Sequence, residues 1–169
     1  PQETILYPDA HARLENRIEL ADNARFIGWE ITCFGLPANQ QDFAQGHAEQ
    51  GVEIRQGGRI KLRERLIINH HSRPIFSAKA GLDGKPVNGL MMAGPFDRQQ
   101  DHGALLASLT QHCQAHPSLA GVSMVDEYIV VRSLHHDSEQ IKQLFNQCWG
   151  HIRPALIGKP ACAPRIWAT

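Results

Sequence analysis

The first half of the chain carries short runs of apolar, β-branched and aromatic residues that are separated by glycine and proline. Runs of this length and composition, bounded by turn-forming residues, are typical of β-strands. Two of the runs flank Gln56-Gly57-Gly58, which favours a hairpin. The predicted strands cover Thr4–Tyr7, Arg25–Phe34, Val52–Arg55, Arg59–Ile68 and Val87–Ala93.

Within Arg59–Ile68, apolar and charged positions alternate until Ile67 breaks the pattern. Such alternation predicts a strand with one buried face and one solvated face. The positions predicted to share the buried face are Ile60, Leu62, Glu64 and Leu66. The positions predicted to face solvent are Lys61, Arg63 and Arg65.

The pattern changes to helical spacing after residue 95. A first helix is predicted over Gln99–His116, with Asp97 and Gln100 as a capping pair and Pro117 as the stop. A second helix is predicted over Ser138–Arg153, where Pro154 is expected to end it. The apolar stripe of the first helix is Leu105, Leu106, Leu109 and Cys113. The apolar stripe of the second is Ile141, Leu144, Phe145, Cys148, Trp149 and Ile152.

Between the two helices, Gly121–Leu134 is typical of a β-hairpin. Its strands are predicted at Val122–Val125 and Tyr128–Val131, with a turn between them. The prolines of the tail Ala155–Thr169 favour an extended conformation.

This order of elements predicts an α+β fold that is predominantly β, because strands and helices occupy separate stretches and do not alternate. The chain is expected to form a single domain. Residues 1–94 would supply a mainly β core, and residues 95–169 would supply the helix-hairpin-helix and the tail. A doubly wound dinucleotide-binding fold is disfavoured for the same reason.

Composition narrows the classes of function. The 17 basic residues balance the 17 acidic ones, so bulk positive charge cannot hold nucleic acid or an anionic membrane surface. The chain has 42% hydrophobic and 20% charged residues, which is typical of a globular protein. No apolar stretch reaches the ~20 residues that a membrane span needs.

The four cysteines contain no CxxC pair, which favours reduced thiols in a cytoplasmic protein. The chain begins with Pro1 and continues directly into a strand-like run, so it is expected to be a piece of a longer protein.

The common catalytic motifs are absent: the sequence contains no GxGxxG, P-loop, GxSxG or HExxH pattern. Ten histidines are many for this length. His112 and His116 are four residues apart on the first predicted helix, a spacing that can hold one transition metal. The alternative is that both are solvated positions beside the apolar stripe, and the lack of a third ligand motif favours this alternative.

Glu30 stands inside an apolar strand, between Trp29 and Ile31. A carboxylate there either turns to solvent or is buried against a partner. Spacing alone favours solvent.

Two stretches of the chain resemble the UreD (UreH) family of urease accessory proteins. PQETI, FIGWEITCFGLPA and DFAQG lie within residues 1–46. Arg153-Pro154, Leu156-Ile157-Gly158 and the terminal PRIWAT resemble the family's C-terminus. The likeness runs in order over the whole chain, which corresponds to the C-terminal portion of the family, without roughly the first 100 residues.

The resemblance implies a core of stacked, β-helix-like layers with two helices in the C-terminal half. It also implies a cytoplasmic, non-catalytic urease maturation factor. Such a chaperone binds apo-urease and UreF, and through UreF the GTPase UreG, and supports nickel insertion into the urease active site. No tightly bound cofactor is expected, only nickel in transit through a polar tunnel.

The resemblance also gives candidate residues for lining the tunnel and for binding partners. The candidates for tunnel lining are Glu3, Glu30, His112 and His116. The candidates for partner binding are Trp149, Arg165, Ile166 and Trp167, although the tail could equally pack on its own domain. Two other functions remain open: a small cytosolic metal-dependent enzyme using His112 and His116, and a protein-interaction module that binds no metal.

Overall fold

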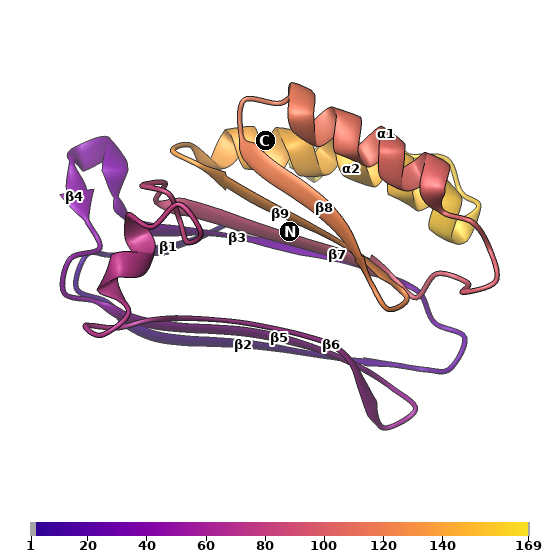
Figure 1. Cartoon of the computed structure of the whole chain (residues 1–169), viewed down its shortest axis with the longest axis horizontal. Coiled ribbons are helices and arrows are strands. Elements are labelled where there is room, and N and C mark those ends of the chain that lie inside the picture. The colour runs from indigo at the N-terminus through magenta and orange to yellow at the C-terminus, as the bar shows by residue number, and fades with distance from the viewer. Residues whose placement is uncertain (1–2, 169) are drawn as a thin grey trace.

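Three layers make up the computed structural model, which describes residues 3–168 apart from the side chains of Ile166 and Ala168. Two helices lie on one face of a first sheet, and a second sheet packs on its other face (Figure 1). We call the first the helix-covered sheet and the second the outer sheet. An α+β fold that is predominantly β is thus confirmed.

The helix-covered sheet has the strand order β1-β3-β7-β9-β8, with β4 paired to one end of β3, and the outer sheet has the order β2-β5-β6. The pairs β1–β3 and β2–β5 are parallel, whereas the other pairs are antiparallel. The strands are β1 Glu3–Leu6, β2 His11–Leu20, β3 Phe26–Leu36, β4 Gln41–Asp42, β5 His47–Gln56, β6 Arg59–Ile68, β7 Val87–Gly94, β8 Leu119–Val125 and β9 Tyr128–His135. The helices are α1 Gly103–Ala115 and α2 Ser138–Ile157.

The outer sheet differs most from the sequence prediction. Strand β6 has the predicted bounds, Arg59–Ile68, and Leu62 and Leu66 face inward as expected. Ile60 is an exception, since it is 44% exposed beside a bulge at the turn end of the hairpin. Strand β5 begins five residues earlier than predicted, at His47, and the whole of β2 was missed.

Both helices have different ends from those predicted. Helix α1 starts at Gly103, because the side chains of Asp97 and Asp101 bind backbone N–H groups in the turns before it. Helix α2 begins as expected, where Asp137 accepts a hydrogen bond from the Glu139 N–H. It continues through Pro154, which costs one backbone hydrogen bond, and ends where Gly158 adopts a left-handed conformation.

The hairpin and the tail also differ from the prediction. Strands β8 and β9 are longer than expected, and they extend the same sheet that β3 and β7 form. The tail, expected to be extended throughout, forms a short 3₁₀ turn at Arg165–Ala168.

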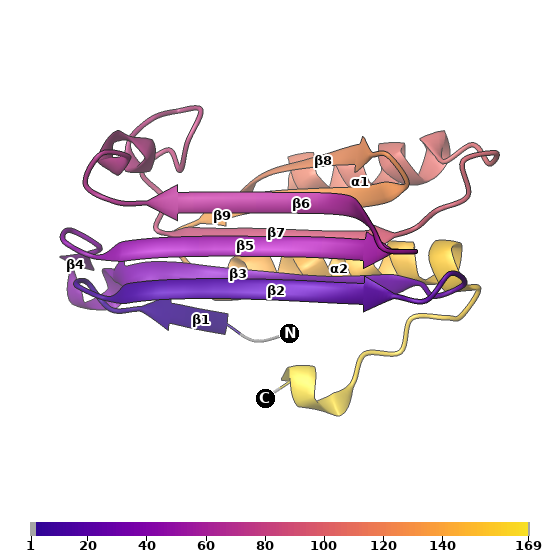
Figure 2. The ribbon, with the colours of Figure 1, turned by 90° about the horizontal axis from the view of Figure 1, so that it is seen from below.

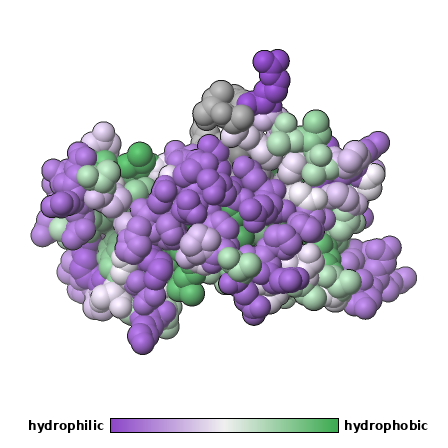
Figure 3. Space-filling model, turned by 90° about the horizontal axis from the view of Figure 1, so that it is seen from above, coloured by the Kyte–Doolittle hydropathy of each residue, from purple (hydrophilic) through white to green (hydrophobic). Residues whose placement is uncertain are grey.

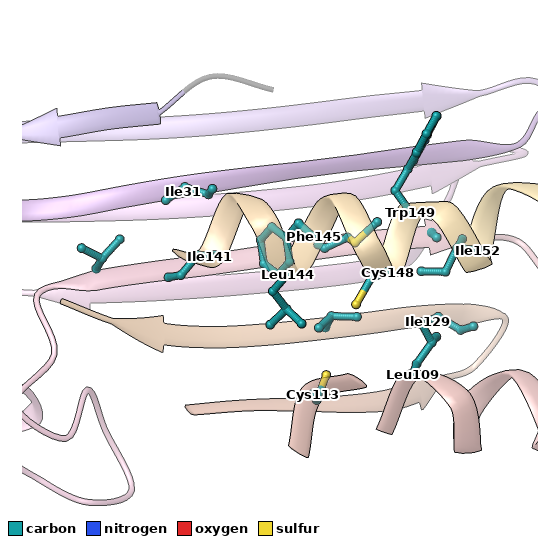
Figure 4. Close-up of a cluster of buried hydrophobic side chains, with 14 of the residues drawn as sticks. Ile31, Leu109, Cys113, Ile129, Ile141, Leu144, Phe145, Cys148, Trp149 and Ile152 are labelled. Carbon is teal, nitrogen blue, oxygen red and sulfur yellow. The ribbon is translucent and has the colours of Figure 1, made fainter. Parts of the chain in front are cut away.

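A continuous apolar core lies between the helices and the helix-covered sheet. All six residues of the predicted α2 stripe are buried there. Leu109 and Cys113 point from α1 toward α2, where the Cys113 and Cys148 thiols meet (Figure 4). Contact with Cys113, together with burial, raises the pKa of the Cys148 thiol, so both cysteines act as small core residues.

The two outer faces of the molecule are polar. The face formed by the helices is mainly hydrophilic, with scattered hydrophobic side chains (Figure 3). On the other side, β2, β5 and β6 lie side by side (Figure 2). Their outward-facing side chains form ion pairs. These pairs are Arg17–Glu53, Arg55–Glu19, Arg63–Glu53 and Arg65–Glu49. Over the described residues, neither helix has the length and apolar character needed to cross a bilayer.

The packing of α2 onto β7 depends on a glycine. A Cβ added at Gly89 would lie 2.4 Å from a methyl carbon of Ile141 and 2.8 Å from the ring of Phe145. We therefore expect Gly89→Ala to lower the free energy of unfolding by about 2 kcal/mol, because an overpacked core must shift. Urea unfolding measures this change.

Gly121 on β8 provides the matched control, since a Cβ there meets nothing within 4 Å. Gly121→Ala should change the free energy of unfolding by less than about 0.5 kcal/mol. Equal losses in the two variants would show that strand glycines matter here for backbone reasons and not for helix packing.

Candidate functional site

A row of polar side chains crosses the interface between the two sheets. Even-numbered residues of β3, β7 and β9 face the outer sheet, so Glu30, Leu90 and Arg132 are neighbours on adjacent strands. The opposing row on the outer sheet is Asn16, Val52 and Glu64. Polar pairs therefore occupy both ends of the double row, with Val52 and Leu90 between them.

A second polar row lies one step along the strands, where Gln50 of β5 faces Thr32 of β3. We call the inward-facing polar residues of both rows the polar belt: Asn16, Glu30, Thr32, Gln50, Glu64, Asn88 and Arg132. The belt divides the apolar contacts between the sheets into two separate clusters. Polar groups inside a sandwich core are costly unless they are hydrogen-bonded.

Glu30 is at the centre of this hydrogen bonding. Its carboxylate accepts a 2.8 Å hydrogen bond from Asn16 Nδ2 and a 2.7 Å hydrogen bond from Gln50 Nε2. Burial raises the pKa of Glu30, and these two hydrogen bonds partly offset the rise. The expectation that Glu30 faces solvent is therefore wrong: the carboxylate points between the sheets and is partly buried against two amide donors.

Gln50 contributes both of its polar atoms to this environment. Its amide nitrogen bridges Glu30 and the Thr32 hydroxyl, with a distance of 3.0 Å to Thr32 Oγ1. Its amide oxygen has no hydrogen-bond partner among the described residues, although the side chain is only 7% exposed. A buried acceptor in this state is available to water or to a cation.

Glu30 borders two cavities. The larger, about 500 Å³, is lined by Glu30, Gln50, Glu64 and Arg132, among others. The smaller, about 280 Å³, lies on the β2 side and includes Asn16 and Glu30 in its lining. Because Glu30 borders both cavities, the belt is a candidate for a polar route from one open edge of the sandwich toward the other.

The chemistry of the route suits a cation that stays briefly. Carboxylate and amide oxygens bind divalent ions, and the belt offers Glu30, Glu64 and the Gln50 oxygen. Among the residues that the structure describes, no three His, Cys, Asp or Glu side chains lie close enough to hold a metal ion. The belt therefore provides isolated ligands and not a closed, tightly binding cage.

The predicted metal-binding residues do not come together. Glu3 is in register with Ile31 on β3, so it lies on the helix side of the sheet, where its carboxylate accepts a 2.9 Å hydrogen bond from Ser138 Oγ. Glu3 and Glu30 thus point to opposite faces of one sheet. A shared tunnel lining is inconsistent with this placement.

The two predicted helix histidines also have other neighbours. His112 packs against His151 of α2, with ring centroids 4.4 Å apart, and its Nδ1 lies 2.8 Å from the Ser108 carbonyl oxygen. His116 follows the last residue of α1, where burial and the nearby His135 lower its pKa. Neither histidine lines the cavities between the sheets.

Two of the four predicted partner-binding residues, Trp149 and Trp167, pack against the chain itself. Trp149 is 7% exposed and belongs to the helix-side core, so it is not available on a surface. Trp167 packs edge-on to both Trp29 and Trp149, with ring centroids 5.0 Å apart in each case. Arg165 is exposed, and the side chain of Ile166 lies outside the described part of the chain.

Comparison with known proteins gives the family. The sequence profile of the UreD urease accessory proteins matches residues 1–168. The chain belongs to the UreD family. It is 71% identical to the urease accessory protein UreD of Marinomonas sp. (strain MWYL1), over the whole of this chain and 56% of that protein. It is 34% identical to UreD of Pseudomonas fluorescens (strain Pf-5), over the whole chain and 58% of that protein. The chain thus spans little more than half the length of these UreD relatives.

The sequence pattern singled out only Glu30 of the seven belt residues as a site residue of this UreD-family chain. The six that it did not single out include Asn16, Gln50 and Arg132. Each stands at an inward position of a strand whose other inward positions are mostly apolar. A polar residue that interrupts such an alternation was the available signal, and Glu64 gave the same signal on β6.

The raised pKa of Glu30 has a consequence for stability. The folded protein holds this proton more tightly than the unfolded chain, so the contribution of Glu30 is most favourable below the ordinary carboxyl pKa. It is lost as the pH rises through the raised pKa. The free energy of unfolding of Glu30→Gln, relative to that of the parent protein, should therefore be larger at about pH 7 than at about pH 4. Urea unfolding at both pH values measures the difference.

Glu53→Gln is the control, because the pKa of Glu53 is shifted in the opposite direction. Hydrogen bonds from Arg63 and then Arg55 lower the pKa of Glu53 on the outer face. The parent protein should therefore exceed this variant in stability at pH 7 and lose that advantage as the pH falls. If both variants followed the same trend, the burial of Glu30 would not be its cause.

The tail contact is testable in the same way. Trp167→Ala should lower the free energy of unfolding by about 2 kcal/mol, less than a fully buried tryptophan loses, because the ring is only partly buried. Arg165→Ala, at an exposed neighbour, should change it by less than about 0.5 kcal/mol. An unaltered stability of Trp167→Ala would mean that the tail is not held on this core.

Proposed function

We propose that the protein containing this chain is a urease maturation factor without catalytic activity of its own. In this role it binds apo-urease and UreF, and through UreF the GTPase UreG, and the assembly inserts nickel into the urease active site. Membership of the UreD family supports this proposal, as does a relative named urease accessory protein UreD at 71% identity. We place this work in the cytoplasm.

The observation that carries the proposal is the polar belt between the sheets. Nickel is the cargo in this proposal, and Glu30 is the side chain that the ion meets in passing between the two cavities that this residue borders. Ni²⁺ accepts carboxylate oxygen as a ligand and binds strongly among the divalent ions, so a closed cage would retain it. Isolated oxygen ligands along such a route allow the ion to be passed on.

The same arrangement explains why no catalytic apparatus is needed. Transfer of an intact ion breaks no covalent bond and requires neither a nucleophile nor a general base. What it requires is a chain of weak ligands and a folded support that keeps them in line. The belt supplies the ligands, and the helix-side core supplies the rigid support.

Glu30→Gln in the protein containing this chain tests the proposal. We expect urease activity in nickel-limited cells to fall severalfold, because the amide keeps the size of the side chain but loses its charge. Added nickel should restore part of the activity, since a weaker ligand fills at a higher concentration.

Glu3→Gln is the matched control, because Glu3 lies on the helix side of the same sheet, away from both cavities. Its activity should match that of the parent protein. Equal activity of all three proteins at limiting nickel would reject a role for the belt in nickel transfer.

The two other functions are separated by direct measurements. A metal-free interaction module would bind UreF and apo-urease while holding no nickel above background in equilibrium dialysis. A metal-dependent enzyme would turn over a substrate and would lose that activity in His112→Ala. The different neighbours of His112 and His116 and the lack of a three-ligand cluster among the described side chains disfavour the enzyme.

A further inference from the structure

One residue that lines the larger cavity, Arg132, carries a positive charge, although the cavity is part of a route proposed for cations. Arg132 of β9 faces the outer sheet and lines the larger cavity together with Glu30 and Glu64. We propose that Arg132 is the selectivity-determining residue of this cavity: its ion pair with Glu64 closes the β6–β9 side to cations and opens when the pair separates. This inference rests on the proposed function.

The ion pair joins the two sheets. The Arg132 guanidinium donates to the Glu64 carboxylate across the interface, and it also lies 3.3 Å from Ser123 Oγ on the neighbouring strand β8. The side chains are 48% and 26% exposed, respectively, so the pair is at the edge of the sandwich and not in its interior. The described part of the outer sheet ends at β6, and Glu64 is therefore the last inward carboxylate on that side.

In the paired state, this edge repels a cation. Glu64 is neutralised by its partner, and the guanidinium presents positive charge that cannot be removed by a proton, because arginine does not titrate in proteins. A divalent ion that approached from this side would find no free carboxylate, and at close range it would meet the N–H groups of the guanidinium, which repel it. The cavity is consequently closed to cations by charge and not by a plug of side chains.

Separation of the ion pair would make this edge of the cavity attractive to a cation. Glu64 would then offer a free carboxylate to the same cavity that Glu30 borders, so that two carboxylates would face one space. The structure leaves room for this movement, because the residue paired with Arg132 on β8 is Gly121, and open space lies beyond its Cα. Ser123, on the same strand, already holds one of the guanidinium nitrogens and marks a direction in which Arg132 can withdraw.

A partly exposed ion pair suits such a device. Pairs at this depth contribute little net stability, typically less than about 1 kcal/mol. They can therefore separate at small cost when a competing carboxylate of a partner protein, or the arriving ion itself, engages one member. A fully buried pair would be too costly to open.

The test is nickel binding to Arg132→Gln, measured by isothermal titration calorimetry on the purified protein. We expect its affinity for Ni²⁺ to rise about fivefold, the change that corresponds to the loss of one repulsive charge at a partly exposed site. Arg132→Lys should bind nickel like the parent protein, because lysine keeps the positive charge. Glu64→Gln should bind nickel more weakly, because it leaves the guanidinium unpaired.

Arg63→Gln is the matched control. Arg63 also pairs with a glutamate, Glu53, but on the outer face of the same sheet and away from both cavities. Its nickel affinity should not change. Urea unfolding of each variant shows whether it is folded, so that a loss of structure is not mistaken for a change in binding.

The outcomes separate this inference from the proposed function. If Glu30→Gln weakens nickel binding while Arg132→Gln binds like the parent protein, the cavity takes cations but Arg132 does not control their entry, and the inference is overturned. If neither variant differs from the parent protein, the cavity is not a nickel site and the proposed function loses its support as well. If Arg132→Gln only lowers stability, the ion pair merely holds the sheets together.

Discussion

The burial of the Glu30 carboxylate is the constraint on which the arrangement of the two sheets depends. A charged group between two sheets is tolerated only when hydrogen-bond donors reach it, and here both donors come from the opposite sheet, Asn16 on β2 and Gln50 on β5. Both donors must therefore keep their register. A slip of one residue in either strand would turn its amide to solvent and leave the carboxylate without a partner.

The polar belt also explains why the apolar core between the sheets is divided, whereas the core on the helix side is continuous. On the helix side, apolar side chains form one continuous cluster around the α2 stripe. Between the sheets, the belt separates one cluster around Tyr128 from another around Phe34. The continuous core supplies the stability, while the divided one leaves the sheets incompletely packed and so accommodates the cavity of about 500 Å³.

Sequence periodicity predicted the continuous core well and the divided core poorly, for one physical reason. The α2 stripe has no interruption, and all six of its predicted members are buried. In β2 and β5, by contrast, Asn16 and Gln50 interrupt an inward series of apolar residues, and these are the strands that were missed or shortened. On these two strands, a residue of the candidate site is therefore what concealed the strand from the periodicity. The opposite placement of Glu3 and Glu30 follows from strand pairing, which one sequence does not reveal.

The two ends of the polar belt differ in charge, so the electrostatic potential that a cation would experience differs from one end to the other. At the β2 end, the groups that donate to the Glu30 carboxylate are neutral amides, which do not cancel a charge on it. At the β6 end, Arg132 cancels the charge of Glu64. The electrostatic potential along the belt is thus most favourable to a cation at Glu30 and least favourable beside Arg132. Since the fold fixes both ends through strand register alone, this gradient requires no bound ion to be present.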